Sequence, residues 1–335
     1  MVELIYDVHA SESGALAILD DLYLKIKTNA ETDKKYVFIV STPDYESAEK
    51  IVVERYPWVK KSWIHRLYFD YITTRKILRK YRPDRVYSLQ NKGIPFFHGE
   101  QDVYLHLPFV LCDYRFDLKK DGKRLWLYQN VLSRSIFKSL RQVNRVIVQT
   151  QWMKDALIQK AGVKEENIFV QPPDISMNVI GTFADTPSNR KRYFYPATAF
   201  HYKNHLTLFK AIEYASRHGL ADYEVILTIK KDENSYTREV AKYVEEHGLN
   251  ALFMGQVSRE KVFELYANSI LLFPSFVESF GLPLLEARLT NTYVVASDCP
   301  FCREILDGYA KARFFDPLNY TDMAEKILGI SLEGE

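Results

Sequence analysis

Hydrophobic positions in the second half of the chain form short continuous runs separated by stretches with helical spacing. The runs predict strands at 192–197, 224–230, 251–256, 269–273, 293–297 and 312–315. The intervening stretches predict helices at 205–218, 236–247, 259–267, 282–290 and 320–329. Regular alternation of strands and helices is typical of a parallel sheet with helices on both faces. We therefore expect an α/β domain here.

The first half alternates in a similar way. Strands are expected at 2–8, 35–40, 83–89, 103–108, 145–150 and 167–174. The first of two long helices is expected from Lys61 to Tyr81, where Ile64, Leu67, Tyr71 and Leu78 recur at helical spacing.

A second long helix is expected from about 124 to 143. Its apolar stripe consists of Leu125, Tyr128, Leu132, Ile136 and Leu140.

Residues 181–191 are polar and rich in turn formers, which predicts a linker. The domains are accordingly expected at 1–180 and 192–335. Two parallel-sheet domains that face each other would form a cleft where the carboxyl ends of their strands meet. The fold class is therefore α/β, with two facing Rossmann-like domains and an interdomain cleft.

Composition restricts the protein class. Of the 335 residues, 47% are hydrophobic and 26% charged, which predicts globular domains with substantial cores. The chain enters a strand at once, without a signal-peptide pattern, and no apolar run reaches membrane-spanning length. Three cysteines do not make a disulfide framework, so we expect a cytoplasmic protein.

Charge is unevenly distributed although the net charge is only +2. Residues 60–92 contain ten Lys/Arg and two acids, and residues 117–145 contain eight and two. These basic helices could be solvated surface, or they could contact RNA or a membrane. No nucleic-acid motif accompanies them, so we expect no nucleic acid.

The chemistry of the chain concentrates between Phe273 and Ala287. A buried strand ends at Pro274, a short loop turns at Gly281, and a helix begins near Pro283. A strand, a tight loop and a helix N-terminus leave backbone N–H groups aimed at one point, which suits a phosphate. Glu278 and Glu286 bracket that point and could accept hydrogen bonds from sugar hydroxyls. The pattern is that of a nucleotide-sugar site.

This segment, with Ser-Phe-Gly-Leu-Pro and Glu-Ala in register, resembles the Glu-x7-Glu signature of retaining GT-B glycosyltransferases of family 4. The resemblance implies transfer of a sugar from a nucleotide-sugar donor to a hydroxyl of a saccharide or lipid-linked acceptor, in cell-surface polysaccharide synthesis. It further implies that Glu286 binds the ribose and that Glu278 lies near the transferred sugar. The backbone of Ser279, Phe280, Gly281 and Leu282 would contact phosphate or sugar oxygens.

Three further residues receive roles from the same resemblance. Lys203 would neutralise the leaving diphosphate, and His106 would contact the donor sugar or line the cleft. Gly14, in the first strand–helix turn, would let the chain approach the donor, although an ordinary turn glycine is an equal alternative. An arginine that the family often has six residues before the lysine is replaced by Ala197.

Other chemistries find less support. Cys299-Pro-Phe-Cys302 has redox spacing but lies beside a late strand, and no second pair suggests zinc. No Asp-x-Asp motif indicates a metal-dependent GT-A enzyme, so neither a metal nor a cofactor is expected. Two rivals remain: a nucleotide-sugar epimerase of the same fold, and a binding protein that has lost catalysis. The expected location is the cytoplasm. Members of the resembling family often place a basic first domain against an anionic membrane, so the resemblance favours peripheral contact with the inner face of the membrane through the helices at 61–82 and 124–145.

Overall fold

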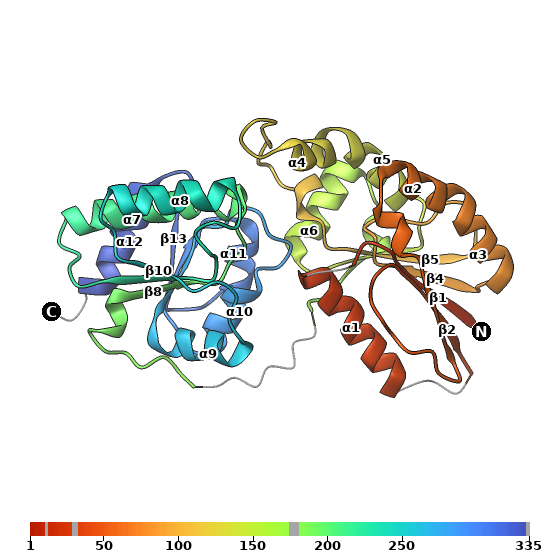
Figure 1. Ribbon diagram of the computed structural model, residues 1–335, viewed down its shortest axis with the longest axis horizontal. Coiled ribbons are helices and arrows are strands. Elements are labelled where there is room, and N and C mark those ends of the chain that lie inside the picture. Colours follow the sequence, from red (N-terminus) through yellow and green to blue (C-terminus); the bar gives the residue numbers. More distant parts are fainter. Residues whose placement is uncertain (11–12, 29–32, 174–180, 333–335) are drawn as a thin grey trace. The chain divides into compact units, whose positions relative to one another are not determined.

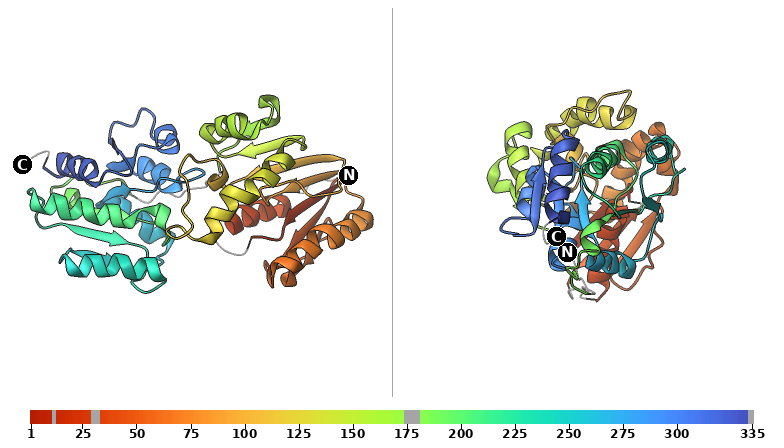
Figure 2. Two further views of the ribbon diagram at one scale, coloured as in Figure 1. Left: turned by 90° about the horizontal axis from the view of Figure 1, so that it is seen from above. Right: turned by 90° about the vertical axis from the view of Figure 1, so that its left-hand side faces the viewer.

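The computed structural model describes residues 1–10, 13–28, 33–173 and 181–332. The chain divides into two compact units (Figures 1 and 2). The first consists of Met1–Cys112 and Trp126–Asp174, and the second of Asp113–Leu125 and Ile175–Glu335. Each unit has its own parallel sheet.

The first unit contains a parallel sheet whose described strands follow the order β3-β2-β1-β4-β5-β6-β7. Their bounds are β1 (Val2–Asp7), β2 (Lys35–Val40), β3 (Ile51–Arg55), β4 (Arg85–Ser88), β5 (Glu100–Leu105), β6 (Arg145–Val148) and β7 (Ile168–Val170). The sequence predicted all of these strands except β3. This strand lies at the sheet edge, and only its first residue, Ile51, is buried, so its hydrophobic pattern is weak.

Helices cover both faces of this sheet. They are α1 (Ser13–Thr28), α2 (Trp63–Tyr68), α3 (Thr74–Tyr81), α5 (Ser133–Leu140) and α6 (Gln151–Ala156); the boundary between the units falls within a further helix, α4 (Lys123–Leu127). Helix α1 lies on one face, with α2 and α3 on the other (Figure 1). Ile5 of β1 packs in one core with Leu19 of α1, whereas its neighbour Leu4 packs in another with Ile77 of α3. This alternation is expected of a strand buried on both faces.

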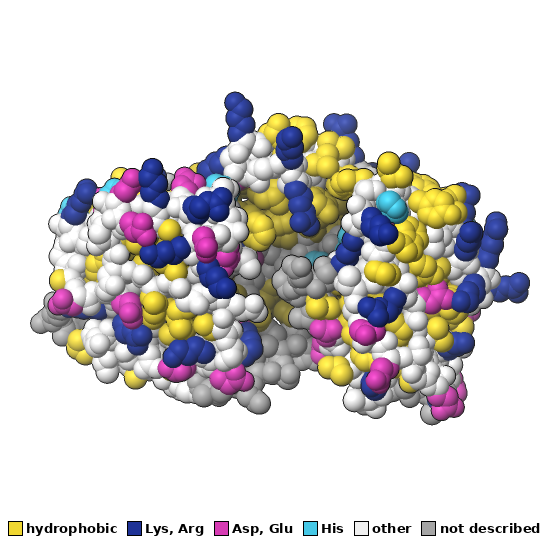
Figure 3. Space-filling view, viewed as in Figure 1, with side chains coloured by type: hydrophobic (Ala, Val, Ile, Leu, Met, Phe, Trp, Pro, Cys, Tyr) yellow, Lys and Arg dark blue, Asp and Glu magenta, His cyan; other side chains and the backbone are white. Residues whose placement is uncertain are grey.

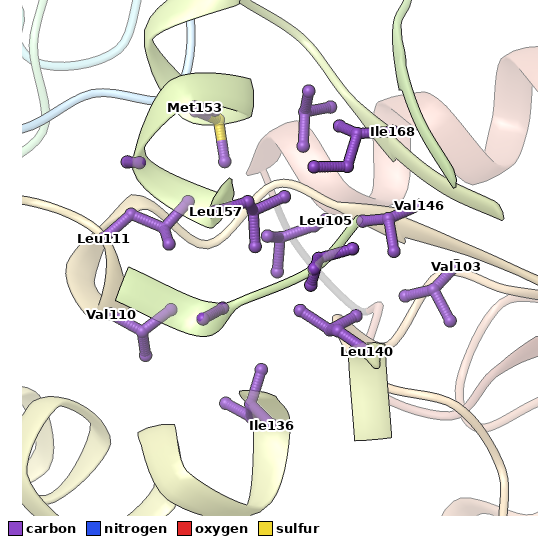
Figure 4. Close-up of a cluster of buried hydrophobic side chains, with 14 of the residues drawn as sticks. Val103, Leu105, Val110, Leu111, Ile136, Leu140, Val146, Met153, Leu157 and Ile168 are labelled. Atoms are coloured by element: carbon purple, nitrogen blue, oxygen red, sulfur yellow. The ribbon is translucent and has the colours of Figure 1, made fainter. Parts of the chain in front are cut away.

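The second long helix forms with its predicted stripe inward. It runs through α4, the π-helical turn η4 (Tyr128–Leu132) and α5. Figure 4 shows Ile136 and Leu140 pointing into a hydrophobic cluster with Val103 and Val146 of β5 and β6. Burial of these apolar side chains stabilises the packing of α5 on the sheet.

The first long helix forms too, but the residues that predicted it face solvent. It consists of α2, the π-helical turn η2 (Phe69–Thr73) and α3. Ile64, Leu67 and Tyr71 are 78%, 54% and 53% exposed, and only Leu78 of the four is partly buried. The apolar spacing therefore indicated a helix correctly, but it does not mark the side that packs on the sheet.

The buried side of that helix contains a paired polar group. Arg66 and Asp70 are only 8% and 5% exposed, and they form an ion pair of 2.9 Å along the helix. Lys92 Nζ lies 3.0 Å from the other Asp70 oxygen. Burial of charges is tolerated when they are paired in this way. Phe69 and Ile77 complete the inward side.

The second unit contains a parallel sheet whose described strands follow the order β10-β9-β8-β11-β12-β13. They are β8 (Arg192–Tyr195), β9 (Glu224–Leu227), β10 (Ala251–Phe253), β11 (Ile270–Phe273), β12 (Val294–Ser297) and β13 (Ala312–Phe315). The helices are α7 (His205–Arg217), α8 (Ser235–Glu246), α9 (Arg259–Asn268), α10 (Leu282–Leu289), α11 (Pro300–Ile305) and α12 (Tyr320–Leu332). Helices α7 and α8 cover one face, and α9 and α10 the other (Figure 1). All predicted strands and helices of this half are present.

The unit boundaries differ from the predicted ones in two places. Residues 181–191, the expected linker, belong to the second unit. Phe183 is buried there, and its N–H donates to the Thr290 carbonyl at 2.8 Å, so this polar stretch is packed rather than free. Residues 113–125, expected in the first domain, also belong to the second unit.

Candidate functional site

The candidate site lies at the carboxyl ends of β8 and β11, which are neighbours in the second sheet. The helices that follow these strands, α7 and α10, lie on opposite faces of the sheet (Figure 1). The two loops therefore diverge, and such a switch point is where open α/β sheets bind ligands. Lys203 lies in the loop after β8, and Glu278 in the loop after β11.

Backbone and amide hydrogen bonds hold these two loops together. The Phe276 N–H donates to the Tyr202 carbonyl at 3.2 Å. The side chain of Asn204 donates to the Pro274 carbonyl at 3.3 Å. Asn204 adopts a left-handed conformation (φ 62°) directly before α7, which asparagine tolerates better than most residues. These hydrogen bonds hold the two loops together as one continuous surface.

The side chains of Lys203 and Glu278 meet on this surface. The Lys203 ammonium donates to Glu278 Oε1, and Ser275 Oγ donates to the same oxygen at 2.8 Å. The two charged side chains are only 14% and 17% exposed. A hydrogen bond of 2.8 Å from the Tyr195 hydroxyl to the Lys203 carbonyl fixes the lysine's backbone. The structure therefore brings together two of the predicted catalytic residues.

The loop after β11 turns into α10 at Gly281. Its φ of +93° lies in the region that favours glycine, and an added Cβ would come within 3.0 Å of Leu284 Cδ1. Pro283 occupies the first turn of the helix, as predicted. Ser279 and Leu282 are partly exposed, whereas the Phe280 ring is buried. Phe280 can therefore serve a ligand through its backbone but not through its ring.

Glu286 lies within α10 and is only 2% exposed. Its Oε2 accepts a hydrogen bond of 2.9 Å from the buried Tyr266 hydroxyl, and its Oε1 accepts one from Arg259. Burial raises the pKa of Tyr266, so the phenol keeps its proton and remains a donor. An ionised carboxylate has about four acceptor positions, so Glu286 keeps capacity for further donors.

Arg259 was missed by the sequence prediction. It is the first residue of α9, follows the N-cap Ser258, and is 54% exposed on its side chain. The sequence contained no motif around Arg259; its only signal was a basic residue at the start of a helix that follows a strand, on the edge of a parallel sheet where ligands bind. Lys203 and Arg259 thus provide one cation for each of the two predicted glutamates.

His205, next in the chain to Asn204, is a buried histidine beneath the Lys203 loop. It is 0% exposed, and neither ring nitrogen has a hydrogen-bond partner among the described residues. Burial lowers its pKa to about 3, with a smaller contribution from the Lys203 charge. The ring is therefore neutral at neutral pH and packs between aromatic rings of Tyr195 and Tyr236.

His106 belongs to the first unit, just after β5. Its backbone N–H donates to Asn91 Oδ1 at 2.8 Å, and its Nε2 lies 3.4 Å from Asn91 Nδ2. Burial lowers its pKa to about 4, so it is neutral at neutral pH. Its buried Nδ1 has no partner among the described residues, which leaves one ring nitrogen uncommitted.

Three sequence features remain to be located. Gly14 lies in the first turn of α1, and its surroundings are outside the described residues. Ala197 is buried, so the position where the family often has arginine contributes no charge. Cys299 and Cys302 are buried, and burial raises the pKa of the Cys302 thiol, which disfavours a reactive thiolate.

Comparison with known families now identifies the chain. Residues 183–335 match the model of glycosyl transferases group 1, and residues 33–177 match the model of glycosyltransferase family 4. The protein is a glycosyltransferase of the GT-B fold. The first match contains Lys203, Glu278, Glu286 and Arg259, so the supported loops lie within the recognised transferase domain.

Solved structures with the same fold cover nearly all of the glycosyltransferase. The Anabaena protein Alr3699/HepE, solved with UDP and glucose, is 16% identical with a TM-score of 0.67, over 98% of this chain and 89% of that chain. A sucrose-phosphate synthase from Thermosynechococcus elongatus is 15% identical with a TM-score of 0.69, over 99% and 90%. The lipopolysaccharide outer core galactosyltransferase WaaB is 15% identical with a TM-score of 0.70, over 100% and 91%. No curated protein matches the chain in sequence.

Proposed function

We propose that this glycosyltransferase moves a sugar from a nucleotide-sugar donor to a hydroxyl of a saccharide or lipid-linked acceptor, with retention of configuration. The carrying observation is the contact between Lys203 and Glu278 at the switch point of the second sheet. A diphosphate requires a cation, which Lys203 provides, and sugar hydroxyls require hydrogen-bond acceptors, which Glu278 provides. The two side chains are in direct contact. The route to cell-surface polysaccharide is part of the same proposal.

Charge development assigns a role to each group. As the bond between the anomeric carbon and the phosphate oxygen breaks, its electron pair moves to the diphosphate, and the Lys203 ammonium stabilises that charge. Glu278 stabilises the positive charge left at the anomeric carbon. The acceptor oxygen then bonds to that carbon, and the proton of the acceptor hydroxyl passes to the departing diphosphate oxygen. Backbone N–H groups at the start of α10 favour the phosphates. Glu286 accepts from the ribose hydroxyls, and neutral His106 contacts the transferred sugar or acceptor.

The donor class has two further supports. One structural neighbour, HepE, was solved in complex with UDP-glucose, and WaaB is named a galactosyltransferase. We therefore propose a UDP-sugar as the first donor to test. No metal ion is needed in this scheme, because Lys203 and the helix N-terminus carry the diphosphate charge.

The cellular setting is also a proposal. No helix in the described ranges is both long enough and apolar enough to cross a membrane. We propose a cytoplasmic enzyme that attaches peripherally to an anionic membrane surface through its basic helices, where a lipid-linked acceptor would be presented.

A donor screen followed by one substitution tests the function. UDP-, GDP- and ADP-sugars are compared by thermal shift, since a ligand that binds the folded state stabilises it. Glu278→Gln should then reduce transfer roughly 100-fold or more, as loss of an electrostatic stabiliser does. The matched control is Glu264→Gln, which removes an exposed carboxylate of the same unit.

Equal turnover by the Glu278→Gln variant and the wild type would contradict the mechanism. Conversion of the donor to an epimer without acceptor would identify the nucleotide-sugar epimerase instead. Product analysis for the anomeric configuration of the new linkage tests retention separately.

A further inference from the structure

Large hydrophobic side chains are exposed along one side of the first long helix. They are Trp63, Ile64, Leu67, Tyr68, Tyr71 and Ile72, with exposures of 62%, 78%, 54%, 51%, 53% and 41%. Their spacing in pairs four residues apart places them on one side of α2 and η2. In Figure 3 hydrophobic side chains gather over α2, with Lys and Arg side chains over α3. We call these six residues the apolar stripe.

Phe96 extends the apolar stripe from a different part of the chain. It is 38% exposed, and its ring meets that of Tyr71 edge-on at 5.9 Å between centroids. Its φ of +68° is unfavourable for a bulky side chain, so the fold holds this ring at the surface against a backbone cost. The Arg75 guanidinium lies 3.8 Å above the same ring. A contiguous patch of this kind marks an interaction surface.

The charges around the apolar stripe have one sign. Residues 60–82 contain eight Lys/Arg and a single acid, Asp70, which is buried and paired. Lys61, Lys76 and Arg79 are exposed, and none of them has an anionic partner among the described residues. The surface is therefore apolar and cationic together, and an occupant must supply negative charge.

This charge distribution indicates which kind of partner could cover the apolar stripe. A second copy placed stripe to stripe would bring like charges together, which disfavours a symmetric dimer. The stripe lies on the outside of a helix that carries Trp and Tyr, residues suited to the boundary between headgroups and acyl chains. We propose that the apolar stripe inserts into the interface of an anionic lipid membrane. This rests on the peripheral attachment in the proposed function and names the element that makes it.

The other basic helix is less available for this contact. Arg141 donates to the Ala161 carbonyl at 2.7 Å, and Arg145 pairs with buried Asp102 at 2.8 Å. The main apolar side of this second helix is packed in the core, as Figure 4 shows for Ile136 and Leu140. The helix at 63–81 exposes six large hydrophobic side chains beside Lys76 and Arg79, whereas the other basic helix exposes two, Trp126 (37%) and Val131 (49%). The helix at 63–81 therefore makes the main membrane contact.

The test compares full-length variants in vesicle sedimentation. Wild type should bind vesicles of equal parts phosphatidylglycerol and phosphatidylcholine, and bind vesicles of phosphatidylcholine alone far less. A triple variant with Trp63→Ser, Ile64→Ser and Leu67→Ser should bind at least about tenfold more weakly, through lost apolar burial. A matched control, Leu24→Ser, Leu252→Ser and Leu318→Ser, removes similarly exposed leucines elsewhere and should bind normally.

Two more variants separate the helices and the charge contribution. Lys76→Gln with Arg79→Gln should weaken binding roughly 25-fold, about fivefold per cation. Arg134→Gln with Lys138→Gln, on the other basic helix, should leave binding within about twofold of wild type. The thermal shift by the nucleotide-sugar donor is measured on every variant, so that loss of the donor site and loss of membrane binding are distinguished.

Three results would overturn the proposal. The first is no preference of wild type for anionic vesicles. The second is equal binding by the stripe variant, or loss of binding on substitution of Arg134 and Lys138. The third is a wild-type dimer in analytical ultracentrifugation that the stripe variant converts to a monomer, because a second copy would then cover the stripe.

Discussion

At the scale of single residues, each predicted glutamate is held by its own cation. Lys203 contacts Glu278, and Arg259 contacts Glu286, which also accepts from Tyr266. The arrangement compensates for Ala197 only in part, because Arg259 lies against the proposed ribose carboxylate. We interpret Arg259 as a positioning residue that orients Glu286.

Substitution of Arg259 tests that interpretation. Arg259→Ala should raise the KM for the donor about tenfold with little change in kcat, since one charge-assisted hydrogen bond to a ground-state binding group is lost. Arg259→Lys should recover part of the loss. Lys261→Ala, an exposed neighbour on the same helix, is the control. A fall in kcat at unchanged KM would contradict a positioning role.

His205 provides a residue-scale prediction about pH. Its folded pKa of about 3 lies below the ordinary value of 6.5, so the unfolded chain binds a proton that the folded chain excludes. The free energy of unfolding should therefore fall as the pH falls through this window, by about 1.4 kcal/mol per pH unit. Asp7, whose pKa burial raises to about 6, acts in the opposite direction in wild type and variant alike.

The measurement is urea unfolding of wild type and His205→Phe at pH 7 and pH 5. The variant removes the titrating ring but keeps its volume among Tyr195 and Tyr236. Its stability should depend less on pH by about 2 kcal/mol over this interval. Identical pH dependence in the two proteins would show that His205 is not buried as a neutral ring.

At the scale of elements, the turn into α10 depends on Gly281. Gly281→Ala should lower the free energy of unfolding by about 1–2 kcal/mol and weaken donor binding, because the left-handed conformation and the contact with Leu284 both become strained. Gly248→Ala is the matched control: its φ is also positive (+59°), but an added Cβ meets nothing within 4 Å. The control should lose stability without losing donor affinity. Unchanged thermal shift by the donor in Gly281→Ala would contradict the role of this turn.

Helices and strands were predictable where the hydrophobic pattern was compatible with only one type of element and one buried side. The strands of the second unit and the stripe on α5 were found in this way. The helix from 61 to 81 shows where such reasoning ends. Its sequence offers two possible inward sides, and the side that is buried contains the pair of Arg66 with Asp70, whose charge is balanced by Lys92 from a distant loop. The local spacing of hydrophobic residues does not show that Lys92, which is distant in the sequence, contacts Asp70.

The candidate site was predictable to a similar extent. Glu278, Glu286 and the turn at Gly281 lie in one continuous motif, so their proximity follows from the chain itself. The meeting of Lys203 with Glu278 follows from strand order, since β8 and β11 are neighbours only after the sheet has formed. Arg259 required the same knowledge and had no motif of its own, so it was missed.

At the scale of the whole molecule, the chain contains two units with separate cores. Calorimetry should therefore resolve two unfolding transitions, and a bound donor should chiefly raise the one that belongs to the second unit, which carries Lys203, Glu278 and Glu286. Leu271→Ala, at a fully buried position of β11, should lower that transition, with a loss of about 2–5 kcal/mol. Val37→Ala, buried in β2, should lower the other. A single transition shifted equally by both substitutions would show that the units unfold together.

The contact between Lys203 and Glu278 also affects selectivity among anions. The Lys203 ammonium donates to the Glu278 carboxylate, and the Ser275 hydroxyl helps to hold that carboxylate. An inorganic phosphate ion must compete with Glu278 for the same cation and has neither a sugar nor a ribose to offer in return. The proposed nucleotide-sugar donor would instead give Glu278 new hydrogen-bond donors when it binds Lys203. We therefore expect inorganic phosphate to compete only weakly with the proposed donor.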